Sequence, residues 1–191
     1  MKRRSFIKTA YLGAAGAVVF SAPGFSSVLG ANDRINLAVI GSNGRAKALT
    51  KAAIDCGRFR VSHACDVDKE ILEQHLAYCS GELGFTPEAE TDFRRILDNQ
   101  DVDAIAVATP DHWHAPMAIL GMQAGKHVYV EKPCSHNPRE GELLVEVRKK
   151  TGKVCQMGNQ QRSSRTSQLA VKEIGEGIIG NVYMGKAWYS N

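Results

Sequence analysis

Short runs of consecutive apolar residues alternate along this chain with longer segments whose apolar residues recur every three or four positions. The runs predict five strands, over residues 35–40, 59–65, 103–108, 127–130 and 154–157. The segments between and after them predict helices over residues 44–56, 68–79, 92–98, 115–124, 138–150 and 167–174. Residues 182–190 alternate between apolar and polar side chains and predict the start of one more strand.

Apolar residues in most of the predicted strands are consecutive rather than at every second position, which indicates strands buried on both faces of a parallel sheet. Strands that alternate with helices across residues 35–157 are typical of a doubly wound nucleotide-binding fold. We therefore predict an α/β fold, a Rossmann-type domain over residues 32–158. Residues 159–191 would begin a second domain, and because their one strand has no partner, we expect the sequence to be C-terminally truncated.

Residues 1–31 are predicted to lie outside this fold. Paired arginines, Arg3 and Arg4, are followed by Ser-Phe-Ile-Lys and then by an uncharged Ala- and Gly-rich segment that reaches Asp33. This pattern resembles a twin-arginine signal and predicts export to the periplasm. The apolar segment is too short and too rich in glycine for a membrane span, so we expect no stable membrane insertion after signal removal. An uncleaved amphiphilic anchor is the alternative.

The charge of the chain comes from this predicted signal. The formal net charge is +4, and four of the 24 basic residues but none of the 20 acidic residues lie in residues 1–31. The predicted domain is therefore neutral. A neutral domain gives no support for a nucleic-acid partner or for an anionic surface partner.

The turn after the first predicted strand reads Gly41-Ser42-Asn43-Gly44-Arg45-Ala46. Gly41 and Ala46 fit the first and third positions of the dinucleotide-binding fingerprint, whereas Asn43 stands at the middle glycine. Asparagine tolerates left-handed geometry better than most residues, and amides at the start of the following helix can hold phosphate. We predict cofactor contacts from Gly41, Ser42, Asn43, Gly44 and Arg45.

Asp66 follows the second predicted strand, 25 residues after Gly41. A carboxylate at that place can bind both hydroxyls of the adenosine ribose and would repel a 2′-phosphate. We therefore predict NAD rather than NADP as the cofactor. The alternative role for Asp66 is to cap the helix that follows it.

Three further motifs are Ala-Val-Ala-Thr-Pro-Asp-His-Trp-His at residues 106–114, Gly-Lys-His-Val-Tyr-Val-Glu-Lys-Pro at 125–133 and Gln-Met-Gly-Asn-Gln-Gln-Arg at 156–162. These motifs make the chain resemble the Gfo/Idh/MocA oxidoreductases, the family of glucose–fructose oxidoreductase and inositol dehydrogenase. The resemblance covers residues 33–191. The resemblance implies a Rossmann domain followed by a larger α+β domain. It also implies NAD(H) in the first domain, a sugar or cyclic polyol between the two, and a homo-oligomeric full-length protein.

The resemblance further implies roles for single residues. Lys132 matches the lysine that contacts the reacting hydroxyl, and is predicted as catalytic, substrate and cofactor residue. Arg162 is predicted to reach the substrate, and the family's proton-accepting histidine would lie beyond Asn191. The other predicted cofactor residues, which flank the nicotinamide or close its site, are Thr109, Asp111, Trp113, His114, Glu131 and Asn159.

His112 and His114 have the spacing of metal ligands, but no third ligand accompanies them in the sequence, so no metal site is predicted. The first functional hypothesis is an exported NAD-dependent oxidoreductase of a sugar or polyol. The second is a redox-type glycosidase that uses catalytic NAD and releases an aglycone without net NADH. The third is a non-catalytic nucleotide-binding fragment, which would retain NAD affinity without turnover.

Overall fold

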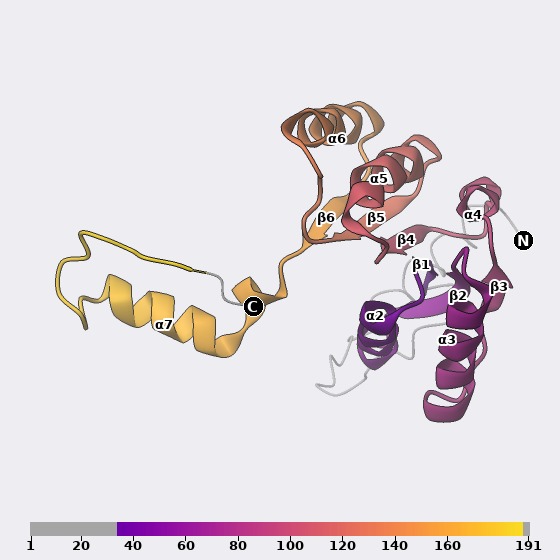
Figure 1. Ribbon diagram of the computed structural model, residues 1–191, viewed down its shortest axis with the longest axis horizontal. Helices are drawn as coiled ribbons and strands as arrows, with labels where there is room; N and C mark the ends of the chain where they lie inside the picture. Colours follow the sequence, from indigo (N-terminus) through magenta and orange to yellow (C-terminus); the bar gives the residue numbers. More distant parts are fainter. Residues whose placement is uncertain (1–33, 189–191) are drawn as a thin grey trace, which may run out of the picture. The chain divides into compact units, whose positions relative to one another are not determined.

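A computed structural model describes residues 34–188 of the chain (Figure 1). Six strands form one parallel sheet in the order β3-β2-β1-β4-β5-β6. The strands are β1 (Ile35–Ile40), β2 (Phe59–Cys65), β3 (Glu88–Glu90), β4 (Ala104–Val107), β5 (His127–Glu131) and β6 (Cys155–Gly158). The predicted Rossmann-type sheet is confirmed.

The helices begin where the sequence supplies capping side chains. Asn43, Asp68, Asp92 and Asn137 each accept a hydrogen bond from a backbone N–H in the first turn of the helix that follows. Gly152, in left-handed geometry, ends the helix whose last turn is cationic. The helices are α2 (Gly44–Asp55), α3 (Lys69–Glu82), α4 (Phe93–Asp98), α5 (His114–Gln123), α6 (Pro138–Thr151) and α7 (Arg165–Gly175), with the 3₁₀ turns η2 (Asp111–Trp113) and η3 (Gln160–Ser163).

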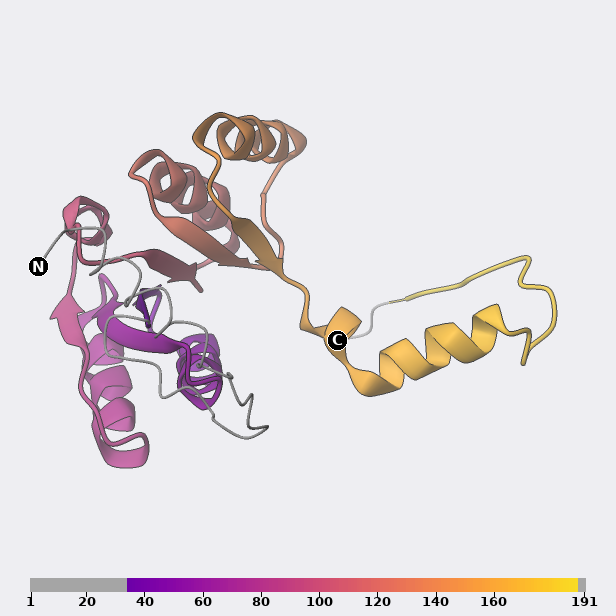
Figure 2. The same ribbon diagram turned by 180° about the vertical axis from the view of Figure 1, so that it is seen from behind.

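The two faces of the sheet bury separate apolar clusters. Ala38 and Ile40 of β1 belong to a cluster with residues of α5 and α6, whereas Leu37 and Val39 belong to one with residues of α2. Helices α5 and α6 lie side by side in both views (Figure 1, Figure 2). Because successive side chains of a strand point to opposite faces, a sheet covered on both sides needs continuous apolar strands.

Two details differ from the sequence-based expectation. Strand β3 was not predicted, because Glu88-Ala89-Glu90 is short and has no apolar run. Residues 182–188 were expected to begin a strand, yet they are not in one, and Val182 and Tyr183 are exposed. A strand must pair its backbone groups with a neighbour, and no neighbour is described beside this segment.

Other expectations concern the ends of the chain. The predicted signal, residues 1–31, lies outside the described residues, and the domain boundary near 158 stays a prediction. Among residues 34–188, no helix has both the length and the apolar character needed to cross a membrane.

Candidate cofactor and active site

The carboxyl ends of the parallel strands face one edge of the sheet, where a cavity of about 1,040 Å³ opens. Strand order reverses between β1 and β4 at this edge, and in doubly wound sheets ligands bind at such a point. Predicted cofactor residues contribute much of the lining, namely Gly41, Ser42, Asn43, Asp66, Thr109 and Trp113.

Gly41 fits this turn because of its geometry. Its φ is +87°, and a Cβ atom there would lie 2.6 Å from the carbonyl oxygen of Ala108 and 2.8 Å from the amide nitrogen of Thr109. Both neighbours are backbone atoms that no side-chain rotation can move. Only glycine therefore lets the β1–α2 turn pack against the loop after β4.

Asn43 does not use the left-handed geometry that its sequence position suggested. Its φ is −76°, and its side-chain oxygen accepts a hydrogen bond of 2.7 Å from the amide of Gly44. Asn43 is thus the N-cap of α2, and the fingerprint tolerates asparagine here because this backbone conformation suits any residue. Asn43, just before α2, lines the cavity, whereas Gly44 and Arg45 do not. Amides at a helix start favour an anion.

Asp66 lies half-buried on the cavity wall. One carboxylate oxygen accepts a hydrogen bond of 2.7 Å from the amide of Ser42, and the other accepts one of 3.0 Å from the amide of Asp68. The helix-cap alternative for Asp66 is wrong, because Asp68 caps α3. Each carboxylate oxygen can accept more than one hydrogen bond, so Asp66 keeps acceptor capacity for a ribose.

Thr109 supplies a test of whether a dinucleotide fits the cavity. Its hydroxyl oxygen is buried and has no hydrogen-bond partner among the described residues, although the residue lines the cavity. Buried hydroxyls are nearly always paired, so rotation of the Thr109 side chain toward a polar ligand in the cavity would satisfy this one. Together with the glycine turn and Asp66, the residues present fit NAD.

Several cavity residues were not predicted from the sequence. Arg94 donates to the carboxylate of Asp92 at 2.7–3.1 Å, and these hydrogen bonds lower the pKa of Asp92 to about 2. Phe93 packs edge-on against Trp113, with ring centroids 6.4 Å apart. Strand β3 comes just before these residues in the chain. Because β3 has no apolar pattern, the sequence does not indicate that these residues lie at the carboxyl edge of the sheet. The unpredicted lining residues include Val67, Ile71, Thr91, Asp92, Phe93, Arg94 and His112.

His114 occupies a different place from its neighbour in the motif. It is 1% exposed, with Nδ1 2.6 Å from the carbonyl oxygen of Pro133 and Nε2 2.8 Å from that of Thr109. His114 therefore ties the loop after β4 to the turn after β5. Its predicted contact with the cofactor stays a prediction, as does that of Asp111, which is exposed in η2.

The remaining predicted residues gather at the ends of β5 and β6. Glu131 is buried and pairs with Arg45, whereas Lys132 is exposed just beyond the strand. Because Glu131 lies opposite Gly158 in the sheet, Asn159 leaves the neighbouring strand beside Lys132. Arg162 follows in η3 and is exposed. These residues do not line the cavity themselves, but they leave the sheet at the same edge.

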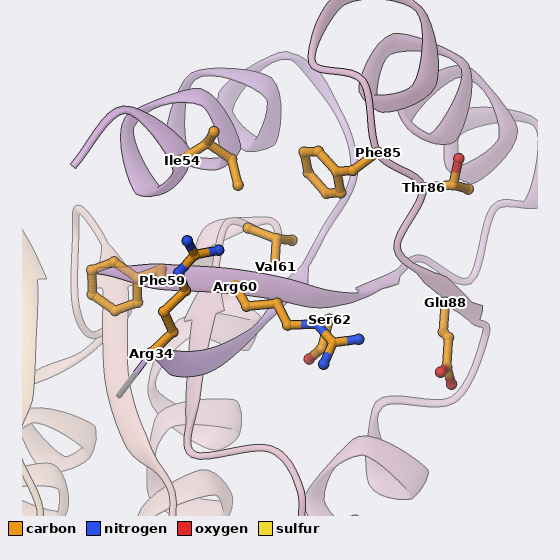
Figure 3. Close-up of a pocket in the computed structure, with 9 residues that line it drawn as sticks. All are labelled: Arg34, Ile54, Phe59, Arg60, Val61, Ser62, Phe85, Thr86 and Glu88. Carbon is orange, nitrogen blue, oxygen red and sulfur yellow. The ribbon is translucent and has the colours of Figure 1, made fainter. Parts of the chain in front are cut away.

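A second, smaller cavity of about 310 Å³ lies beside the first half of β2 (Figure 3). Ile54, Val61 and Phe85 form its apolar part, and Arg34 and Arg60 reach it from the segment before β1 and from β2. It contains none of the predicted site residues. The larger cavity at the carboxyl edge is therefore the candidate site.

Residues 35–159 match the family described as "Oxidoreductase family, NAD-binding Rossmann fold" (GFO_IDH_MocA). Among curated relatives, a "Glycosyl hydrolase family 109 protein" of Shewanella pealeana is 28% identical over an aligned length of 209 residues. The alignment covers 99% of this chain. The match covers 46% of that relative, so the chain spans about half the length of the protein it matches.

Solved structures give the same family relationship. A myo-inositol 2-dehydrogenase from Lactobacillus plantarum superimposes with a TM-score of 0.69 at 25% identity, over 78% of this chain and 43% of that one. The WlbA dehydrogenase from Bordetella pertussis, solved with NADH and UDP-GlcNAcA, gives a TM-score of 0.66 at 27% identity, over 75% and 42%.

Proposed function

The chain belongs to the oxidoreductase family with an NAD-binding Rossmann fold, and we propose that it functions as an NAD-dependent oxidoreductase. Its proposed substrate is a sugar, a sugar derivative or a cyclic polyol. The observation that carries the proposal is the cavity at the strand-order reversal, with Asp66 on its wall and Lys132 leaving the same edge of the sheet. The relationship to a myo-inositol dehydrogenase and to a dehydrogenase solved with UDP-GlcNAcA supports the substrate class.

Each residue has a defined task in this proposal. NAD⁺, when bound, supplies the acceptor for a hydride from the carbinol carbon of the substrate. Asp66 holds the adenosine ribose, and the start of α2 holds the pyrophosphate. Lys132 contacts the reacting hydroxyl at Nζ, orients it, and in its neutral form takes its proton. Arg162 extends toward the substrate.

Lys132→Met should lower turnover of the native protein about 10²–10⁴-fold, the usual contribution of a positioned acid or base, and weaken NADH binding far less. Lys132→Arg is the matched control, because it keeps the positive charge but cannot release a proton near neutral pH. NADH formation is followed by absorbance with a panel of sugars and inositols. Full turnover by Lys132→Arg would contradict the proton-accepting role.

A redox-type glycosidase is the second candidate, and the relative named as a glycosyl hydrolase family 109 protein favours it. Such an enzyme would release an aglycone from a glycoside with catalytic NAD and no net NADH. Incubation with aryl glycosides, with aglycone and NADH measured together, separates the two activities. Net NADH without aglycone release supports the dehydrogenase, and aglycone release without NADH supports the glycosidase.

We also propose export through the twin-arginine route, on the basis of the basic start of the chain. Replacing both Arg3 and Arg4 by lysine should retain the protein in the cytoplasm of its host. Cell fractionation and immunoblotting measure the distribution. Equal periplasmic recovery of the variant and the wild type would contradict this route.

A further inference from the structure

Glu131, the last residue of β5, is a carboxylate with a side chain only 6% exposed. Its Oε1 accepts a hydrogen bond of 2.6 Å from Nε of Arg45 and one of 3.2 Å from the hydroxyl of Tyr129. Arg45 is the second residue of α2, and β4 lies between β1 and β5 in the sheet. The ion pair therefore joins the phosphate turn to the strand that leads into Lys132.

The neighbouring strand leaves room for this ion pair. Gly158 of β6 lies opposite Glu131 in the parallel register. A Cβ atom at Gly158 would come 2.8 Å from Oε1 of Glu131 and still closer to the hydroxyl of Tyr129. The position of the carboxylate is thus defined by α2, β5 and β6 together.

The electrostatics favour a charged pair. Burial alone would lower the pKa of Arg45, but the hydrogen bond and charge of Glu131 outweigh it, and the net pKa is raised. Burial, and then the charge of Glu131, raise the pKa of Tyr129. A buried carboxylate is costly unless it is paired, so removing Arg45 would leave Glu131 charged without its counter-ion.

The ion pair between Arg45 and Glu131 also holds the side chain of Glu131 away from that of Lys132. Glu131 is turned inward to Arg45, whereas Lys132 is exposed. The amide of Lys132 lies 3.4 Å from Oε2 of Glu131. A shift of the Glu131 side chain would therefore move the backbone from which Lys132 starts.

We propose that Arg45 is a positioning residue, which acts on the cofactor site through Glu131 by fixing the end of β5 to the start of α2. It is then not a direct ligand of the cofactor phosphates. The inference rests on the proposed function, because it concerns the NAD site of the same cavity.

A double-mutant cycle on NADH affinity tests it, with Arg45→Gln, Glu131→Gln and the combination measured by fluorescence titration of the 191-residue chain. Each single change should weaken NADH binding about tenfold, the scale seen for residues that act without touching the ligand. The combination should also lose about tenfold rather than a hundredfold, because both changes break one interaction. Lys51→Gln, which breaks an exposed ion pair to Asp55 on α2, is the control and should change nothing.

Two further readouts separate positioning from direct binding. The thermal stability should be lowered by Arg45→Gln and restored by adding Glu131→Gln, because no buried charge then remains unpaired. A direct phosphate ligand would contribute to the salt dependence of NADH affinity, so an unchanged salt dependence in Arg45→Gln supports positioning. If Arg45→Gln does not fold, Glu131→Gln is compared with the combination, in which no buried charge is unpaired: equal NADH affinities support positioning, and a further loss in the combination makes Arg45 a direct ligand.

The outcomes are distinct. Losses that multiply in the combination, or a loss in Arg45→Gln with none in Glu131→Gln, would overturn the positioning role and make Arg45 a direct ligand. Full affinity in both single variants would overturn any role of the pair. No NADH binding by the wild-type chain would contradict the proposed function itself, together with this inference.

Discussion

Asp66→Ala is expected to weaken NAD binding about 10- to 100-fold, because hydrogen bonds to a charged group contribute roughly 1.5–3 kcal/mol each. The affinity for NADP should fall much less, since the carboxylate would no longer repel a 2′-phosphate. The discrimination between the two cofactors therefore narrows. Titration calorimetry with NAD⁺ and NADP⁺ measures both affinities.

Asp68→Ala is the matched control for this prediction. Asp68 caps α3 two residues after Asp66, through hydrogen bonds from the amides of Glu70 and Ile71. Its loss should cost about 1 kcal/mol of stability but leave the ratio of NAD to NADP affinity unchanged. Unchanged affinities for both cofactors in Asp66→Ala would remove Asp66 from the ribose site.

Gly41→Ala is expected to destabilise the fold by about 3 kcal/mol or more and to abolish NAD binding. A positive φ costs an L-residue about 1–2 kcal/mol, and the new Cβ would overlap the backbone of Ala108 and Thr109. Relief requires moving the turn away from the loop after β4, which opens the cavity wall. Chemical denaturation measures the free energy of unfolding.

Substitutions at two other glycines separate the conformational cost of a positive φ from the steric cost of the added Cβ atom. Gly57 has a φ of +69°, but a Cβ atom added there would meet no atom within 4 Å, so Gly57→Ala should lose only the conformational part. Gly44, at the first position of α2, has neither constraint, and Gly44→Ala should be neutral or slightly stabilising. Equal stabilities of Gly41→Ala and Gly57→Ala would contradict the close approach described for Gly41.

The sequence predicts much of this fold because parallel strands buried on both faces must be apolar throughout. That requirement makes β1, β4 and β5 recognisable as apolar runs, whereas β2 and β6 mix polar with apolar residues and are partly exposed. The turn after β1 and the acid after β2 then follow from chain order. β3 is invisible for the same reason, because its three residues lie at the sheet edge and are mostly polar. The sequence predicts the helix over residues 92–98, but without β3 it does not place Asp92 at the cavity.

The sequence also does not predict which distant side chains contact one another, or what surrounds each of them. Arg45 and Glu131 are 86 residues apart, and they meet only because of the order in which the strands assemble. The resemblance assigns His114 and not His112 to the cofactor, yet the structure places His112 on the cavity wall and buries His114. Spacing alone cannot distinguish two such environments.

A crystal structure of the chain with NADH tests the central claim most directly. The account predicts the adenosine ribose on Asp66, the pyrophosphate at the start of α2, and the nicotinamide at the edge of the sheet beside Lys132. A dinucleotide bound away from this cavity, or a nicotinamide directed away from Lys132, would contradict it.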